Sequence, residues 1–250
     1  MLETIDHGDI RELKLARSPA NALNPALVHQ FTTALQEASA DASAVVVSGL
    51  PGMFCAGLDL PELIDCDREE LSRFWQSFLR LLKTLSHMPI PTAFALTGHA
   101  PAGGIVMSLY GDYRIMPGGK YKTGLNEVQV GLVVPSVIHR ALVRTIGAHA
   151  AERILVAGEI MTSDRALQIG LIDEVVDEPE QTVTRAIEWC QQHLALPREA
   201  MMTTRSMTRA DLHAIFDDSS ALGVEKFVEV WFSEASQSTL RKVVDRLQKK

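Results

Sequence analysis

Residues 43–60, SAVVVSGLPGMFCAGLDL, begin as an unbroken apolar run and end in a turn that contains two glycines. The run is typical of a strand that is buried on both faces. The turn places Gly52 and Gly57 around an apolar pair and finishes at Asp59. A glycine beside a small residue lets a second backbone or a ligand approach closely. The turn is therefore either a ligand contact or a tight strand-to-helix connection that Asp59 caps.

The same pattern returns at residues 92–112, TAFALTGHAPAGGIVMSLYGD. After a short strand, Gly103 and Gly104 open an almost wholly apolar segment, which is typical of a helix buried all round. The first turn of such a helix carries N–H groups without a helical partner, so it is a site for an anion or an oxyanion. Close helix packing through glycine is an equal alternative. If the two turns face one another, each offers one N–H to the same carbonyl oxygen.

Strands and helices alternate around these turns. Residues 9–17 alternate like a strand, Asn24 is a good helix cap, and residues 24–38 and 68–88 carry apolar residues at helical spacing. The two apolar stripes are Leu27, Phe31, Leu35 and Ala38, and Leu71, Phe74, Trp75, Phe78, Leu82 and Leu85. This alternation predicts an α/β fold. Because the signals are mostly helical from about residue 180, we expect a core over residues 1–180 and a helical segment over residues 181–250.

The composition argues against several classes of protein. The chain has 250 residues and a formal net charge of −7, whereas nucleic-acid binding calls for a basic face. No apolar run is long enough for a membrane helix, and the N-terminus has no apolar signal core. The three cysteines have no CxxC spacing, and the histidines have no metal-ligand spacing. We therefore expect no metal site, no nucleic acid and no membrane as a partner.

A single acid, Glu127, lies in the stretch GLNEVQVG at residues 124–131. A lone Glu is often a cap or a surface residue. Here Val128, Val130, Leu132 and Val133 favour burial nearby, and burial would raise the pKa of Glu127 above about 4.3 towards the range of a general base.

Other catalytic motifs fail. The chain has no GxSxG, residues 98–104 do not match GxGxxG, and residues 114–123 depart from a phosphate loop at Arg114 and Tyr121.

Together, these stretches resemble the crotonase superfamily, the enoyl-CoA hydratase/isomerase fold. The resemblance covers at least residues 10–177 and rests on the order and spacing of five stretches. They are ANALNPAL (20–27), FCAGLDL (54–60), GHAPAGG (98–104), GDYRI (111–115) and GEIMTSDRALQIGLIDEVV (158–176). The resemblance implies a crotonase-like spiral of ββα turns with a helical C-terminal trimerisation segment, assembled as a homotrimer or a dimer of trimers. It also implies a coenzyme A thioester as the substrate, with no separate cofactor.

The resemblance assigns roles to residues of both turns. It places the oxyanion hole on the backbone N–H groups of Ala56 and Gly103. The coenzyme's adenine and pantetheine would be lined by Ala56, Gly57, Leu58, Asp59 and Leu60. Arg17, close to the first turn, is a candidate for the coenzyme phosphates.

One position departs from the hydratases of this superfamily, which typically use two glutamates. The second glutamate corresponds to Glu127, whereas Val106 occupies the place of the first. Adding water calls for two carboxylates, but moving a double bond by one carbon needs only one, which takes a proton and returns it. The stretches around Gly103 and Glu127 look like those of mitochondrial-type enoyl-CoA isomerases, with Gly111 in place of a Cys, and the match adds Asn126 as a substrate-lining residue.

We therefore expect Glu127 to be the catalytic base of an isomerase that converts 3-enoyl-CoA to trans-2-enoyl-CoA in the β-oxidation of unsaturated fatty acids. A hydratase or hydrolase on the same fold is an alternative, because fold alone does not decide chemistry. A non-enzymatic acyl-CoA binding protein is a third reading. The expected compartment is the bacterial cytosol, or the mitochondrial matrix if a transit peptide has been removed.

Overall fold

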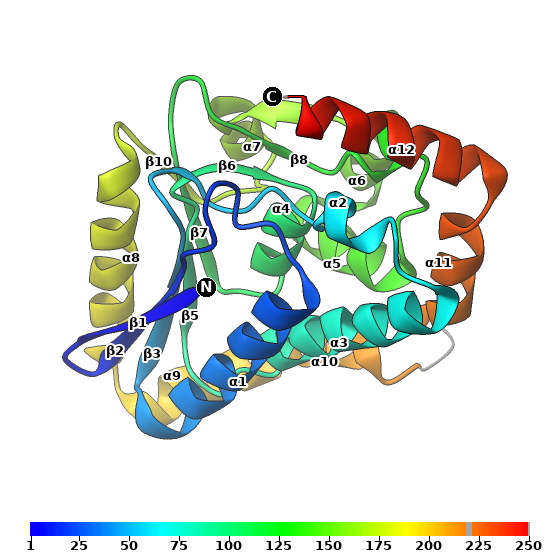
Figure 1. Cartoon of the computed structure of the whole chain (residues 1–250). Helices are drawn as coiled ribbons and strands as arrows, with labels where there is room; N and C mark the ends of the chain where they lie inside the picture. Colours follow the sequence, from blue (N-terminus) through cyan, green and yellow to red (C-terminus); the bar gives the residue numbers. More distant parts are fainter. Residues whose placement is uncertain (219–221, 250) are drawn as a thin grey trace.

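The computed structural model describes residues 1–218 and 222–249, and it confirms the α/β class (Figure 1). Its strands are β1 (Leu2–His7), β2 (Ile10–Leu15), β3 (Ala44–Ser48), β4 (Gly52–Met53), β5 (Thr92–Ala95), β6 (Gly98–Pro101), β7 (Tyr113–Pro117), β8 (Lys122–Gly124), β9 (Ile160–Thr162) and β10 (Glu174–Val176).

The helices up to residue 168 are α1 (Pro25–Asp41), α2 (Leu60–Leu63), α3 (Arg68–Ser86), α4 (Gly103–Ser108), the 3-10 turn η1 (Glu127–Val130), α5 (Ser136–Ile146), α6 (Ala148–Ala157) and α7 (Ser163–Gln168). Those after it are α8 (Pro179–Leu194), α9 (Arg198–Thr208), α10 (Ala210–His213), η2 (Ala214–Phe216), α11 (Val224–Trp231) and α12 (Glu234–Gln248).

The larger sheet has the strand order β1-β2-β3-β5-β7-β10, and all of its neighbouring strands except β1 and β2 run parallel. Strand β3 is buried along its whole length, as its unbroken apolar run predicts. Because side chains alternate along a strand, Val45 and Val47 enter the main core beneath α1 and α3, whereas Ala44 and Val46 pack under α8 on the opposite face. The sheet therefore separates two apolar layers (Figure 1).

The two sequence-predicted helices form where their caps and apolar stripes place them. The side chain of Asn24 accepts a hydrogen bond from Leu27 N at 2.9 Å, and Pro25 takes the first helical position of α1. Helix α3 begins at a capping box between Asp67 and Glu70. Every residue of the two predicted stripes is buried. The apolar spacing of the sequence was therefore sufficient to define these two helix faces.

The smaller sheet, with the order β4-β6-β8-β9, brings the two glycine-bearing turns together. Strands β4 and β6 pair in parallel with Gly52 opposite Gly98. A Cβ atom on Gly98 would lie 1.9 Å from the carbonyl carbon of Gly52, so no larger residue fits at position 98. Since the two strands are parallel and in register, the turns that follow them leave the sheet at the same edge.

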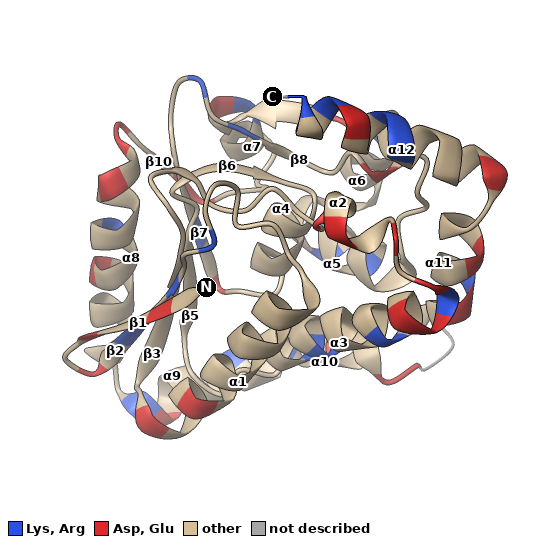
Figure 2. Ribbon diagram, in the orientation of Figure 1, with Lys and Arg blue, Asp and Glu red and all other residues tan. Residues whose placement is uncertain are grey.

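The C-terminal helices pack back onto the rest of the chain. Helix α8 covers one face of the larger sheet through Ala186 and Cys190. The division into residues 1–180 and 181–250 stays a prediction. Along α12, Lys and Arg alternate with Asp and Glu (Figure 2). Among residues 1–218 and 222–249, no helix has the length and apolar character to cross a bilayer.

An ion cluster of Asp112, Arg205 and Arg209 connects helix α9, and the residue after it, to the core. Asp112 accepts hydrogen bonds from Arg205 Nη2 and Arg209 Nη1, each at 2.8 Å, and from the backbone N–H of Thr92 at 2.7 Å. Arg209 is almost fully buried, and loss of hydration lowers its pKa to about 10. In this cluster, the single carboxylate of Asp112 therefore forms ion pairs with two guanidinium groups.

Replacing the shared carboxylate should destabilise the protein strongly. In Asp112→Asn, two guanidinium groups would remain at a site that has lost its charge, and breaking a buried pair costs about 3–5 kcal/mol. Urea unfolding followed by circular dichroism measures the loss. The matched control is Glu229→Gln, which breaks an exposed pair with Lys226 and should cost no more than about 0.5 kcal/mol. Equal losses in both variants would contradict the structural role of Asp112.

Candidate active site

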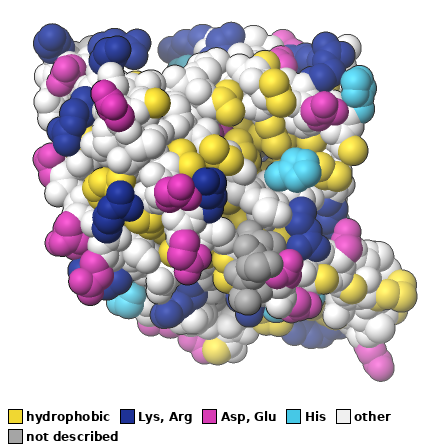
Figure 3. All heavy atoms as spheres, turned by 90° about the vertical axis from the view of Figure 1, so that its right-hand side faces the viewer, with side chains coloured by type: hydrophobic (Ala, Val, Ile, Leu, Met, Phe, Trp, Pro, Cys, Tyr) yellow, Lys and Arg dark blue, Asp and Glu magenta, His cyan; other side chains and the backbone are white. Residues whose placement is uncertain are grey.

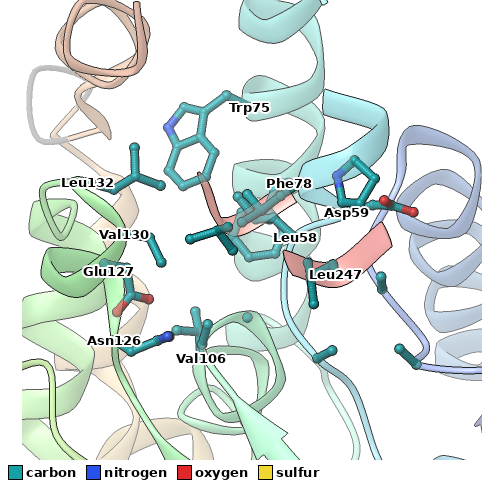
Figure 4. Close-up of a pocket in the computed structure, with 18 of the residues that line it drawn as sticks. Leu58, Asp59, Trp75, Phe78, Val106, Asn126, Glu127, Val130, Leu132 and Leu247 are labelled. Atoms are coloured by element: carbon teal, nitrogen blue, oxygen red, sulfur yellow. The ribbon is translucent and has the colours of Figure 1, made fainter. Parts of the chain in front are cut away.

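A cavity of about 600 Å³ opens between the two turns, η1 and the helices α3, α5, α11 and α12 (Figure 4). The residues that line it are mostly apolar. The predicted site residues among them are Ala56, Leu58, Asp59, Leu60, Gly103, Asn126 and Glu127. Gly57 lies behind this lining, where a Cβ atom on it would come within 3.0 Å of Ala102 and 3.2 Å of the backbone nitrogen of Gly103. The two turns therefore face one another, as the sequence predicts.

In the first turn, one backbone N–H group has no hydrogen-bond acceptor among the described residues. The N–H of Leu58 has no acceptor among the described residues, whereas every other N–H from residue 54 to residue 60 has one. The acceptors are His99 O for Phe54 and Cys55, Ala20 O for Ala56, Cys55 Sγ for Gly57, Leu23 O for Asp59, and Leu58 O for Leu60.

The N–H of Ala56, which the resemblance assigns to the oxyanion hole, has a backbone acceptor in this structure. It donates to Ala20 O at 3.0 Å. An N–H that is committed to a strong backbone acceptor is not free to bind a substrate oxygen. Leu58, two residues further along the same turn, also lines the cavity and has its N–H unpaired. Leu58 takes the place of Ala56 as the candidate donor.

The second donor lies at the start of α4. Gly103 is the first residue of this helix, so its N–H has no partner within the helix. A Cβ atom on Gly103 would lie 2.9 Å from Leu23 Cδ1 and 3.2 Å from Gly57 Cα, which explains the glycine. Ala102, just before it, has φ of 47°, a conformation that costs an L-residue energy and is concentrated at functional sites. Gly103 also lines the cavity, and its role as an oxyanion donor stays a prediction.

Glu127 is the first residue of η1, which ends at Gly131 with φ of 80°. Its side chain is half-buried, and its Oε2 atom is buried without a hydrogen-bond partner among the described residues. Loss of hydration raises the pKa of Glu127 to about 7, as burial of an unpaired carboxylate requires. Figure 4 shows Glu127, Asn126 and Val106 together on one side of the cavity. A base with this pKa can both accept and return a proton near neutral pH.

Neighbours in the sequence supply part of the apolar wall around Glu127. Val130, Leu132 and Val133 line the cavity together with Glu127, although Val133 is 56% exposed, whereas Val128 is 42% exposed and is not part of the lining. Distant elements supply the rest of the wall, with Val106 of α4 only 1% exposed.

Aromatic residues close the far end of the cavity. Trp75 and Phe78 come from α3 and Phe227 from α11, and the rings of Trp75 and Phe227 stack with centroids 3.7 Å apart. Leu247 of α12 lines the cavity as well, so the C-terminal helices take part in the site. Sequence reasoning had assigned Trp75 and Phe78 to a helix face without connecting them to the cavity.

The same packing places apolar side chains of α11 inside this chain. Phe227, Val228 and Trp231 are buried within this chain, and Phe227 stacks on Trp75. Apolar side chains do gather on the face seen from the side of α11 (Figure 3). The trimer, or dimer of trimers, stays a prediction.

Asp59 and Arg17 form an ion pair at the edge of the cavity. Arg17 Nη2 lies 2.6 Å from Asp59 Oδ2 and 3.4 Å from Glu62 Oε2. Asp59 also caps α2 by accepting a hydrogen bond from Glu62 N at 3.2 Å, as the capping alternative predicts. The charge of Arg17 is therefore balanced by two carboxylates within the chain, which weakens the case for Arg17 as a phosphate ligand.

Comparisons with known proteins place this geometry in a family. The family model described as enoyl-CoA hydratase/isomerase matches residues 6–249. This chain belongs to the enoyl-CoA hydratase/isomerase family. It is therefore an enzyme of that family, and the resemblance stated from the sequence is confirmed.

Individual relatives of this family carry both activities in their names. Human mitochondrial enoyl-CoA delta isomerase 1 is 31% identical over 239 residues, which are 94% of this chain and 79% of the relative. A probable enoyl-CoA hydratase of Mycobacterium avium is 30% identical over 225 residues, which are 88% of this chain and 85% of the relative.

Solved structures confirm the crotonase-like fold. The crystal structure of human mitochondrial delta3-delta2-enoyl-CoA isomerase superposes with a TM-score of 0.93 at 29% identity, over 99% of this chain and 98% of that one. The enoyl-CoA hydratase EchA3 of Mycobacterium ulcerans superposes with a TM-score of 0.82 at 25% identity, over 90% of this chain and 98% of that one. Isomerase and hydratase therefore share the fold, and the family alone does not choose between them.

The buried carboxylate should make stability depend on pH. With the pKa of Glu127 raised to about 7, the folded state holds a proton between about pH 4.5 and 7 that the unfolded state has released. Stability from this group is therefore present below about pH 4.5 and is lost as the pH rises through 7. Thermal unfolding at pH 5 and pH 8 should show Glu127→Gln gaining stability over the wild type at pH 8 only.

The control for this effect is Glu152→Gln, an exposed glutamate of α6. It should leave the pH dependence of unfolding as in the wild type. If Glu127→Gln and Glu152→Gln behave alike at both pH values, the raised pKa of Glu127 is refuted.

Proposed function

We propose that this enzyme moves the double bond of a 3-enoyl-CoA to the trans-2 position, with Glu127 as the only proton carrier. The observation that carries the proposal is a carboxylate whose buried Oε2 atom has no hydrogen-bond partner among the described residues, in a cavity lined by two residues, Leu58 and Gly103, whose backbone N–H groups are unpaired there. Among the described residues that line this cavity, Asp59 is the only other carboxylate, and it forms an ion pair with Arg17.

The reaction needs one base and one oxyanion site. The carboxylate of Glu127 takes a proton from C2, between the thioester and the C3–C4 double bond. The electron pair of the C2–H bond forms a C1–C2 double bond as the π pair of the thioester carbonyl moves onto oxygen, so the dienolate keeps its C3–C4 double bond and carries its negative charge on the thioester oxygen. The N–H groups of Leu58 and Gly103 donate to that oxygen, and each such donor typically contributes about 10²–10³ in rate. Protonated Glu127 then returns the proton to C4: the carbonyl re-forms, the C1–C2 pair becomes the C2–C3 double bond, and the C3–C4 π pair forms the new C4–H bond.

Val106 supports the isomerase over the hydratase. Its apolar side chain is 1% exposed and lines the cavity on the side of Glu127. Among the described residues, no second carboxylate lines that side of the cavity to activate a water molecule, and an apolar wall would keep water away from the dienolate. The substrate is then a coenzyme A thioester, and the reaction as drawn calls for no metal or redox cofactor. In metabolism such an enzyme would serve the β-oxidation of unsaturated fatty acids.

A hydratase is the second candidate, because the probable hydratase of Mycobacterium avium is about as similar to this chain as the human isomerase is. Hydration would need Glu127 to activate water alone. Incubation with 3-hexenoyl-CoA and, separately, with crotonyl-CoA discriminates the two activities when each product is followed. The same assay at high enzyme concentration excludes or reveals a protein that only binds acyl-CoA.

Removing the proton carrier should abolish isomerisation. Glu127→Gln keeps the shape of the side chain but accepts no proton, so kcat on 3-hexenoyl-CoA should fall about 100-fold or more. In the wild type, kcat/KM should rise as the pH increases through about 7, because the base acts in its ionised form and its pKa is about 7. A variant that keeps more than about a tenth of the wild-type kcat would remove Glu127 from this role.

Placing a second carboxylate beside Glu127 should shift the balance towards hydration. Val106→Glu would bring two like charges together, which raises one of the two pKa values. We expect this variant to gain some hydration of crotonyl-CoA, to lose isomerase rate and to lose stability, because a charge replaces a buried residue. The measurement is the ratio of the two rates, with Val106→Leu as an apolar control. Wild-type hydration as fast as isomerisation would contradict the proposal.

A further inference from the structure

The loop at residues 17–24 holds the turn that carries the Leu58 donor. Leu23 N donates to Gly57 O at 2.8 Å, and Asp59 N donates to Leu23 O at 3.0 Å. These two bonds enclose Leu58 from either side and leave its own N–H unpaired. Leu58 is therefore positioned by its neighbours in the turn, which are themselves fastened to a segment more than 30 residues earlier.

The loop itself is held in shape by a buried asparagine. Asn21 adopts φ of 48°, is fully buried, and accepts a hydrogen bond from Arg17 N at 2.7 Å. Its Nδ2 donates to Phe54 O at 2.9 Å. The same residue thus ties the beginning of the loop to the beginning of the turn.

The ion pair of Arg17 and Asp59 is a second link between this loop and the turn, at the residue after Leu58. Asp59 directly follows Leu58, and its side chain is 10% exposed. Arg17 donates from Nη1 to Ala22 O at 3.0 Å and pairs through Nη2 with Asp59 Oδ2 at 2.6 Å. One guanidinium group therefore fixes both the loop and the residue after the donor, which its planar set of donors allows.

We propose that Arg17 and Asp59 are positioning residues, whose ion pair holds the Leu58 N–H at the oxyanion site. This inference rests on the proposed function. An oxyanion donor works only when it is aimed in advance at the charge that develops, and a displacement of about 1 Å can cost about 100-fold in rate. Among the described residues, the hydrogen-bond and ion-pair partners of these two side chains are Ala22, Glu62 and each other, and Glu127 is not among them.

The two oxygens of Asp59 allow the ion pair to be separated from the helix cap. Oδ1 accepts from Glu62 N, whereas Oδ2 pairs with Arg17. In Asp59→Asn the amide oxygen can keep the cap while the NH₂ group meets the guanidinium. We expect kcat on 3-hexenoyl-CoA to fall about tenfold or more, with KM changed less than about threefold, because the donor acts in the transition state.

Two further variants test whether the effect belongs to this pair. Arg17→Gln should lose as much kcat as Asp59→Asn, and the double variant should lose no more than either, because both act through one interaction. The matched control is Glu62→Gln, which removes the second, longer contact of Arg17 at 3.4 Å and leaves Leu58 untouched. It should keep kcat within about twofold of the wild type, as expected for a pair with an exposed partner.

A vibrational measurement reports on the donor directly. In trans-2-hexenoyl-CoA labelled with ¹³C at the thioester carbonyl, hydrogen bonds from the oxyanion site lower the carbonyl stretching frequency. Asp59→Asn and Arg17→Gln should show a smaller lowering than the wild type at saturating ligand, whereas Glu62→Gln should match it. A merely structural role would lower the unfolding temperature without moving this frequency.

The outcomes separate this inference from the proposed function. If the wild type neither isomerises 3-hexenoyl-CoA nor shifts the carbonyl frequency, the proposed function fails. If the wild type does both but folded Asp59→Asn and Arg17→Gln keep its kcat and frequency, only the positioning role is overturned. A rise in KM with unchanged kcat in Arg17→Gln also overturns it, and assigns Arg17 to binding of the coenzyme.

Discussion

The close approach of two glycine-bearing turns is the constraint on which the site depends. Gly98 lies so near Gly52 that any side chain at position 98 would occupy the space of the opposing backbone. The parallel pairing of β4 and β6 then delivers Gly57 and Gly103 to the same place, where their backbones touch. Two N–H groups can converge on one small cavity only because nothing but backbone separates them. Side chains at these positions would push the donors apart.

The environment of Glu127 makes its ionised form less stable and raises its pKa. A carboxylate that is buried without a partner is costly to ionise, and burial alone raises the pKa of Glu127 to about 7. Asp59, at the edge of the same cavity, is instead paired with Arg17 and caps a helix. Two carboxylates in one cavity thus differ in environment, because Asp59 is paired with a guanidinium group whereas the Oε2 atom of Glu127 is buried without a hydrogen-bond partner among the described residues. Environment, not residue type, separates the proposed base from the structural acid.

Relatives named as isomerases and as hydratases share this fold, so the difference in chemistry must lie within the cavity. The backbone turns and Glu127 would serve an oxyanion intermediate in either reaction. The position at which the sequence predicts a difference is Val106, which is apolar and almost fully buried and lines the cavity with Glu127. At the aromatic end of the cavity, the stacked rings of Trp75 and Phe227 join two helices that are distant in the sequence. Packing of the C-terminal helices therefore belongs to the site as much as to the fold.

The sequence by itself determined the features that depend on local spacing. The buried β3, the faces of α1 and α3, the two glycine turns and the single acid Glu127 all follow from residues within a few positions of each other. Only the tertiary structure decided that Ala20 O occupies the N–H of Ala56 and leaves that of Leu58 free, because a hydrogen-bond acceptor can come from any part of the chain. It likewise decided that Val128 is exposed and that the apolar residues of α11 face α3. Burial and hydrogen-bond pairing are settled by contacts between distant segments, so they cannot be inferred from residues within a few positions of each other.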